Sequence, residues 1–187
     1  VRKEFPGVRL IENDRNVGFA TANNQAIRQS AGRQVLLLNP DTVVVDNALA
    51  EMVVFMQSHG DVGIVGPTVL NPDGTVQMVC GRHFPTVFSE FCALTKLSKM
   101  FPKNRVLGRR LMGYWSHRDT RRVDMVSGAC MMVSRQAIDE VGLMDERLFL
   151  GAEEPDWCYR MMERGWKVYL DSGATIIHYG GRSMEKS

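Results

Sequence analysis

A run of four aliphatic residues, Val35-Leu36-Leu37-Leu38, is followed directly by Asn39-Pro40-Asp41. The run is too short to cross a membrane and is typical of a strand that is buried on both faces of a sheet. Proline has no amide hydrogen with which to continue a strand ladder, so this strand must end here. Because ligands collect beyond the carboxyl ends of strands in open α/β sheets, Asp41 is a candidate ligand for a hard cation that could hold a diphosphate. An ordinary strand and turn is the alternative interpretation of these residues alone.

Helix and strand patterns alternate on both sides of this strand. Glycine stops predict a helix from Gly18 to about Gly32. A second helix, capped by Asp46, is predicted from the apolar spacing of Leu49, Met52, Val53 and Met56. Such alternation predicts an α/β fold with a mainly parallel sheet and helices on its faces. The other expected strands cover 8–12, 62–70, 123–134, 167–171 and 175–178.

The start of the first expected helix carries small residues and side-chain amides. Gly18 precedes the helix, and Asn23 and Asn24 follow within its first two turns. Glycine and a helix N-terminus allow the backbone to approach an anionic ligand closely. A helix that simply packs tightly against the sheet explains the same residues equally well.

Composition excludes some classes of protein. A net charge of +2 argues against a nucleic-acid binder, and 44% hydrophobic residues are ordinary for a globular domain. The four cysteines show no zinc spacing and lie beside apolar segments, so we expect reduced, buried thiols. Residues 80–122 break the helix–strand alternation with aromatic and basic side chains, which favours either a solvated helical excursion or a peripheral contact with anionic lipid.

Two further features contain side chains that could act in catalysis or bind a metal ion. Glu153 and Glu154 precede Pro155, which predicts that the helix opens at Pro155 and that Glu154 is its N-cap. Paired acids at this place usually only cap a helix, but one of them could act as a general base. His178 ends the last expected strand and could share a divalent ion with Asp41, although a lone histidine is more often structural.

Taken together and in this order, these motifs resemble the family-2 glycosyltransferases of the GT-A fold, especially rhamnosyltransferase-like members. The resemblance covers nearly the whole chain except 80–122. It rests on the stretches Asn16-Val17-Gly18-Phe19-Ala20, Leu36-Leu37-Leu38-Asn39-Pro40-Asp41, Ser127-Gly128-Ala129-Cys130, Val141-Gly142-Leu143-Met144-Asp145, Glu153-Glu154-Pro155-Asp156-Trp157-Cys158-Tyr159-Arg160 and Ile177-His178-Tyr179-Gly180-Gly181-Arg182-Ser183.

The resemblance implies an inverting transfer from a nucleotide-diphospho-sugar that is bound over Mg²⁺ or Mn²⁺. Asp41 matches the last acid of the family's metal motif, and Asn39 replaces the first acid, which makes His178 more important as a ligand. Glu154 matches the catalytic acid, with Glu153 as the competing candidate. The implied donor-side residues are Gly18, Asn23, Asn24, Asn39, Asp41 and His178, and the implied acceptor-side residues are Gly128, Ala129, Asp156, Trp157 and Arg160.

The resemblance also sets expectations for the whole protein. It implies a single GT-A-like domain over 1–187 that lacks the family's usual first strands, with 80–122 as a variable helical insertion. The expected acceptor is a saccharide or a lipid-linked saccharide of cell-surface polysaccharide synthesis, in the cytoplasm or at the inner face of the membrane. A second copy supplying the missing strand, as a homodimer, is an open expectation. The alternative function is a non-catalytic module that binds a nucleotide-sugar.

Overall fold

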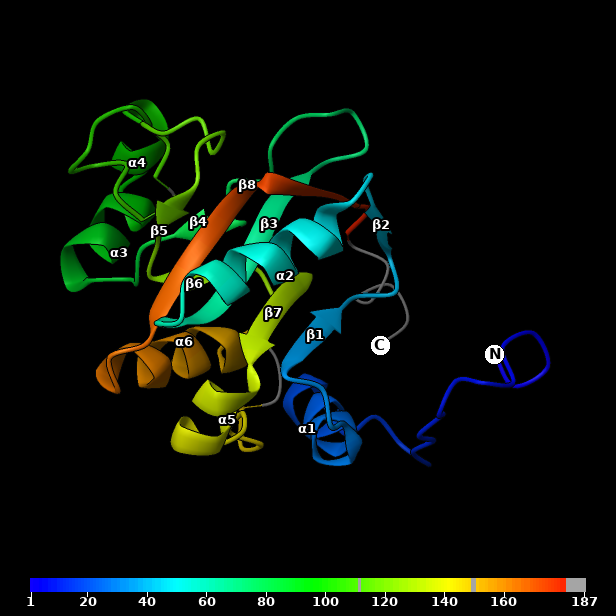
Figure 1. Ribbon diagram of the computed structural model, residues 1–187. Coiled ribbons are helices and arrows are strands. Elements are labelled where there is room, and N and C mark those ends of the chain that lie inside the picture. Colours follow the sequence, from blue (N-terminus) through cyan, green and yellow to red (C-terminus); the bar gives the residue numbers. More distant parts are fainter. Residues whose placement is uncertain (111, 149–150, 181–187) are drawn as a thin grey trace.

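The computed structural model describes residues 1–110, 112–148 and 151–180 (Figure 1). Its main sheet runs in the order β1–β7–β3–β8–β2, and β5 also pairs with β8. The strands are β1 (Gln34–Leu38), β2 (Thr42–Val44), β3 (Val62–Leu70), β5 (Arg121–Arg122), β7 (Cys130–Ser134) and β8 (Lys167–His178). The predicted strands after the first helix are therefore present, and the α/β class is confirmed.

The expectation of a mainly parallel sheet is wrong at the level of strand pairs. Among the described strands only β3 and β8 pair in parallel, and β7 lies antiparallel between β1 and β3. The reason is where β7 begins: Cys130 pairs with Leu38, the last residue of β1. A strand that enters the sheet at that end must run back toward the start of β1.

The two ends of the sheet also differ from the sequence prediction. The strand expected over 8–12 is absent, because residues 1–18 contain no helix or strand and the side chains over 8–12 are mostly exposed. β1 is an edge of the sheet among the described strands, and a strand from a second copy stays a prediction. The two strands expected over 167–178 form the single strand β8, which bulges at Ser172–Ala174.

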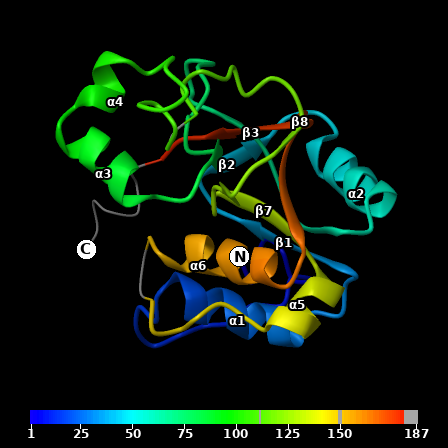
Figure 2. The same cartoon turned by 90° about the vertical axis from the view of Figure 1, so that its left-hand side faces the viewer.

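Helices cover both faces of the sheet, as predicted. Helix α2 (Ala48–Ser58) packs against β3 and β8 on one face. Helices α5 (Arg135–Val141) and α6 (Glu153–Glu163) pack on the other face, with α1 (Phe19–Gln29) beside them (Figure 2). The cap predicted at Asp46 falls one residue later, at Asn47.

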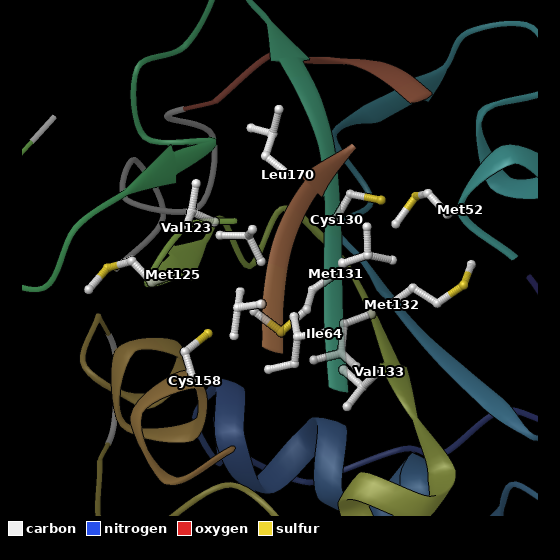
Figure 3. Packing of buried hydrophobic residues seen from close by; sticks show 14 of the residues in the cluster. Met52, Ile64, Val123, Met125, Cys130, Met131, Met132, Val133, Cys158 and Leu170 are labelled. Carbon is white, nitrogen blue, oxygen red and sulfur yellow. The ribbon is translucent and has the colours of Figure 1, made fainter. Parts of the chain in front are cut away.

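The core between these layers is rich in aliphatic and sulfur-containing side chains. Ile64 of β3 and Met131 of β7 are completely buried and belong to the cluster drawn in Figure 3. All four cysteines are free and buried, as predicted, and burial raises the pKa of the Cys130 and Cys158 thiols to about 12. These thiols are therefore packing groups.

Residues 80–122 stand at one end of the sheet. β4 (Gly81–Arg82) pairs with β6 (Met125–Val126) in a second, two-stranded sheet. Helix α3 (Val87–Leu94) begins with a capping box between Thr86 and Ser89, and α4 (Leu97–Met100) follows. In the described part of the chain no helix is long and apolar enough to cross a membrane.

Candidate active site

The end of β1 and the end of β8 bring the predicted pair together. The Thr42 hydroxyl donates to the Asn39 carbonyl at 2.7 Å and closes the turn that holds Asp41. Thr42 pairs with His178 across the β2–β8 ladder. The Oδ1 atom of Asp41 consequently lies 3.4 Å from Nε2 of His178, with both side chains largely buried.

Gln77 fixes the orientation of the histidine. Its Nε2 donates to the His178 carbonyl at 2.8 Å, so its Oε1 must be the atom that lies 3.1 Å from Nδ1 of His178. An amide oxygen only accepts, and Nδ1 therefore carries the proton. In the neutral ring, Nε2 presents its lone pair to Asp41. The sequence offered no signal for this contact, since 101 residues separate the partners.

This arrangement suits a divalent cation. Two ligands that bind one ion at about 2.1 Å in cis positions stand about 3.0–3.4 Å apart, close to the separation found here. A hydrogen-bonded second partner on the other ring nitrogen is the usual support of a ligating histidine. Within 1–110, 112–148 and 151–180 no group of three or more His, Cys, Asp or Glu side chains converges. A diphosphate would have to supply further ligands.

The acidic pair lies on α6, but the helix starts earlier than predicted. Its first residue is Glu153 and its N-cap is Ala152, so Glu154 is not the cap. The buried carboxylate of Glu153 accepts a hydrogen bond from the Ala152 amide at 2.8 Å. Glu153 is thereby committed to the helix start, and Glu154 is the acid left for other contacts.

Gly128 gives Glu154 its position. A Cβ atom at residue 128 would lie 2.1 Å from Oε1 of Glu154, so any other residue would displace the carboxylate. Burial and then the charge of Glu153 raise the pKa of Glu154, while Arg82 and the Gly128 amide oppose the rise. Such an acid is a stronger base once it is ionised.

One loop connects the two halves of the site. Gly128 contacts Glu154, and the carbonyl of the next residue, Ala129, accepts a hydrogen bond from the Asn39 amide at 2.9 Å. The loop therefore places Glu154 and the turn that carries Asp41 on two sides of Gly128-Ala129.

Three predicted acceptor-side residues make contacts that hold helices together, and the acceptor contacts of Asp156 and Arg160 stay predictions. Trp157 is completely buried and donates to the Gly142 carbonyl at 2.9 Å, so it cannot face an acceptor. Asp156 pairs with Arg160 at 2.7 Å, and Arg160 donates to the Leu143 carbonyl at 2.9 Å. These contacts fasten α6 to the end of α5.

The predicted donor-side residues of α1 differ from one another. The buried amide of Asn24 donates to the Met144 carbonyl and to Glu146, and it accepts from the Met144 amide. The side-chain amide of Asn24 is thus occupied by hydrogen bonds within the protein, which argues against a contact with the nucleotide-sugar donor. Gly18 has a positive φ of 83° at the N-cap, and Asn23 donates to the Phe19 carbonyl. Their donor contacts stay predictions, and the motif residues Gly181, Arg182 and Ser183 lie outside the described residues.

The model of the family "Glycosyltransferase like family 2" matches residues 1–187. The chain belongs to this family.

Curated relatives agree with this assignment. The chain is 29% identical to N-acetylglucosaminyl-diphospho-decaprenol L-rhamnosyltransferase of Mycobacterium tuberculosis, over 97% of this chain and 62% of the relative. It is 26% identical to the low-salt glycan biosynthesis hexosyltransferase Agl10 of Haloferax volcanii, over 91% of this chain and 52% of the relative. The chain therefore spans between half and two thirds of the length of these proteins.

Solved structures share the fold. GalNAc-T7 with UDP, GalNAc and Mn²⁺ superposes with a TM-score of 0.61 at 17% identity, over 91% of this chain and 32% of that one. The mannosyltransferase PcManGT from Pyrobaculum calidifontis, in complex with GDP-Man and Mn²⁺, gives a TM-score of 0.60 at 15% identity. That match covers 96% of this chain and 42% of the neighbour.

Proposed function

We propose that this chain is the catalytic part of an inverting, metal-dependent glycosyltransferase that uses a nucleotide-diphospho-sugar, with rhamnose as the favoured sugar. The observation that carries the proposal is the Asp41–His178 pair at 3.4 Å, connected through Gly128-Ala129 to a desolvated Glu154. The name of the Mycobacterium tuberculosis relative, N-acetylglucosaminyl-diphospho-decaprenol L-rhamnosyltransferase, supports rhamnose as the sugar and a lipid-linked saccharide as the acceptor.

Asp41 and His178 would hold Mg²⁺ or Mn²⁺, which neutralises charge on the departing diphosphate when it is bound. Glu154 removes the proton of the acceptor hydroxyl, and the oxygen attacks the anomeric carbon as the bond to the diphosphate breaks. Glu153 keeps the start of α6 in place through the Ala152 amide. Because attack and departure occur on opposite faces of the sugar, the anomeric centre inverts.

The outer surface of α3 and α4 supports a site of action at a membrane. Val87 is 92% exposed and Leu94 84% exposed, beside basic side chains such as Lys96. Apolar side chains mixed with lysines are typical of surfaces that rest on anionic lipid. We propose that this α3–α4 surface contacts the cytoplasmic face of the membrane.

Metal-dependent binding of nucleoside diphosphates tests the site. Isothermal titration of UDP, GDP and dTDP with MnCl₂ and then with EDTA should reveal one metal-dependent ligand for the unchanged protein. Asp41→Ala should weaken this binding at least tenfold, and His178→Ala should also weaken it. Glu51→Ala, on the exposed side of α2, is the matched control.

Equal metal-dependent affinity in Asp41→Ala and the unchanged protein would refute the assignment of Asp41. Turnover with a panel of nucleotide-sugars separates the enzyme from a binding module, because a module binds the diphosphate without consuming the sugar donor.

A further inference from the structure

The loop that follows β3 returns the chain to the end of that strand. The backbone amide of Asn71 donates to the Thr75 carbonyl at 2.7 Å, and the Thr75 hydroxyl donates to Asp73 at 2.6 Å, so the loop closes on itself. The backbone amide of Gln77 then donates to the carbonyl of Val69 at 2.8 Å. The side chain of Gln77 therefore starts from a backbone position that β3 fixes.

This side chain continues the contact of β3 with β8 beyond the last strand pair. The register of β3 against β8 ends at Leu70 and Ile177, one residue before His178. Beyond that point the Gln77 side-chain amide donates to the His178 carbonyl at 2.8 Å, and its oxygen lies 3.1 Å from Nδ1 of the same histidine. One side chain therefore holds both the backbone and the ring of His178.

The two contacts determine what Nε2 of His178 can do. The proton on Nδ1 points to Gln77, so Nε2 of a neutral ring is a hydrogen-bond acceptor. The Oδ1 atom of Asp41 lies 3.4 Å from this nitrogen, and a carboxylate oxygen is likewise an acceptor. Two lone pairs thus face each other between largely buried side chains, which is unfavourable until a cation lies between them.

The other neutral form of the ring would close the site. With its proton on Nε2, His178 would donate to Asp41 directly, and the two side chains would satisfy each other without a metal ion. Gln77 disfavours this form, because its oxygen would then face the lone pair of Nδ1 while its nitrogen stays bonded to the His178 carbonyl. The tautomer of the ring thus decides whether a cation can enter.

We propose that Gln77 is a positioning residue of the metal site, which keeps the proton of His178 on Nδ1 and leaves Nε2 and Asp41 available to a divalent cation. The inference rests on the proposed function, because it concerns the same metal site. Gln77 acts through His178 and is not itself a ligand. A ligating histidine is usually held in this way through its other ring nitrogen, and the chain provides this support from a distant loop.

The tautomer of His178 is measured first, in metal-free protein. Nitrogen-15 NMR of the imidazole rings in EDTA, at about pH 8, where an ordinary histidine is neutral, should show the proton of His178 on Nδ1. Loss of these signals in His178→Ala assigns them. Gln77→Met removes both hydrogen-bonding groups and keeps the length of the side chain, so the proton should move to Nε2. Gln77→Glu keeps an acceptor for Nδ1 and should retain the Nδ1–H form.

Metal-dependent binding of UDP, GDP and dTDP is measured next, by isothermal titration with MnCl₂. Gln77→Met should weaken this binding by about tenfold or more, the usual effect of losing such a second contact, and Gln77→Glu should lose less. Gln136→Met is the matched control, because Gln136 is exposed on α5 and donates to Glu140 at 3.1 Å. It should change neither the tautomer nor the affinity. Melting temperatures establish that each variant is folded.

The outcomes separate the role of Gln77 from the metal site itself. A proton on Nε2 of His178 in the unchanged protein, or undiminished metal-dependent affinity in folded Gln77→Met, overturns the inference for Gln77 alone. Equal losses in Gln77→Met and Gln77→Glu overturn it as well, because they would reduce Gln77 to a packing contact. Absence of metal-dependent binding in the unchanged protein overturns the proposed function together with this inference.

Discussion

The surroundings of Glu154 make its ionised carboxylate less stable and, in the proposed mechanism, a stronger base. Its carboxylate lies against Gly128 in a place where a side-chain methyl group at residue 128 would not fit. Burial and the charge of Glu153 favour the protonated form, which raises the pKa of Glu154. An ordinary exposed glutamate would be more stable when ionised but a weaker base.

The raised pKa of Glu154 predicts a pH-dependent effect of Glu154→Gln. The folded state binds this proton more tightly than the unfolded state, so ionisation costs stability as pH rises from the ordinary glutamate pKa through the raised value. Glu154→Gln removes that cost and should raise the melting temperature at pH 7 but not at pH 4.

In the same variant, turnover should fall by about two to four powers of ten, the usual contribution of a general base, while donor affinity stays nearly constant. Glu153→Gln is the comparison and should lose less turnover. The reverse order of the two variants would transfer the role of base to Glu153. A melting temperature that is lower than normal at pH 7 would contradict the stated cause of the pKa shift.

Helix α1 shows how an element can be held by one buried side chain. Asn24 spans α1 and the segment 144–146 with three hydrogen bonds, and its side chain is completely buried. Its neighbour Asn23 bonds within its own helix. Replacing Asn24 would therefore leave buried backbone groups of Met144 without hydrogen-bond partners, whereas replacing Asn23 would not.

Asn24→Ala should destabilise the protein by about 1–3 kcal/mol, because it leaves the Met144 amide and carbonyl buried without partners. Asn23→Ala should change stability by less than about 0.5 kcal/mol, since its partner also serves the helix. Urea unfolding of both variants measures the difference. Equal losses at the two positions would contradict the structural assignment of Asn24.

At the scale of the whole molecule, the active-site elements and the α3–α4 surface lie on different parts of one body (Figure 1). The sheet carries Asp41 and His178 at strand ends, while the exposed apolar side chains project from residues 87–106. This division would allow the protein to rest on a membrane through the proposed α3–α4 contact while the proposed donor site stays in water.

The double variant Phe88→Ser, Phe91→Ser tests the membrane contact. Both rings are half exposed, so their loss should leave the melting temperature nearly unchanged. Binding to phosphatidylglycerol vesicles, measured by co-sedimentation, should fall several-fold, and added salt should weaken the remaining attraction. Unchanged co-sedimentation of the double variant would exclude these rings from a membrane surface.

Much of the fold and part of the site follow from local sequence pattern. The strand over 62–70 was predicted to the residue, because a buried apolar run between turn signals leaves little choice. The strand end at Asp41 and its pairing with His178 were also predicted, and the structure places Asp41 beside His178. Glu154 was predicted as the cap of its helix, and the structure places it inside the first turn of α6. Their chemical roles stay predictions.

Only the tertiary structure decided the contacts between distant segments. The sequence cannot show that Gln77 contacts His178 or that Arg82 lies near Arg110. It also cannot show that the side chain of Asn24 binds the backbone of Met144. It also could not give the direction of β7, which depends on the end of β1 at which the chain re-enters the sheet. Local pattern determines which segments form helices and strands, because neighbouring residues set backbone preference and periodicity. Packing of these segments then determines which side chains meet, because hydrogen bonds and burial act between residues far apart in sequence.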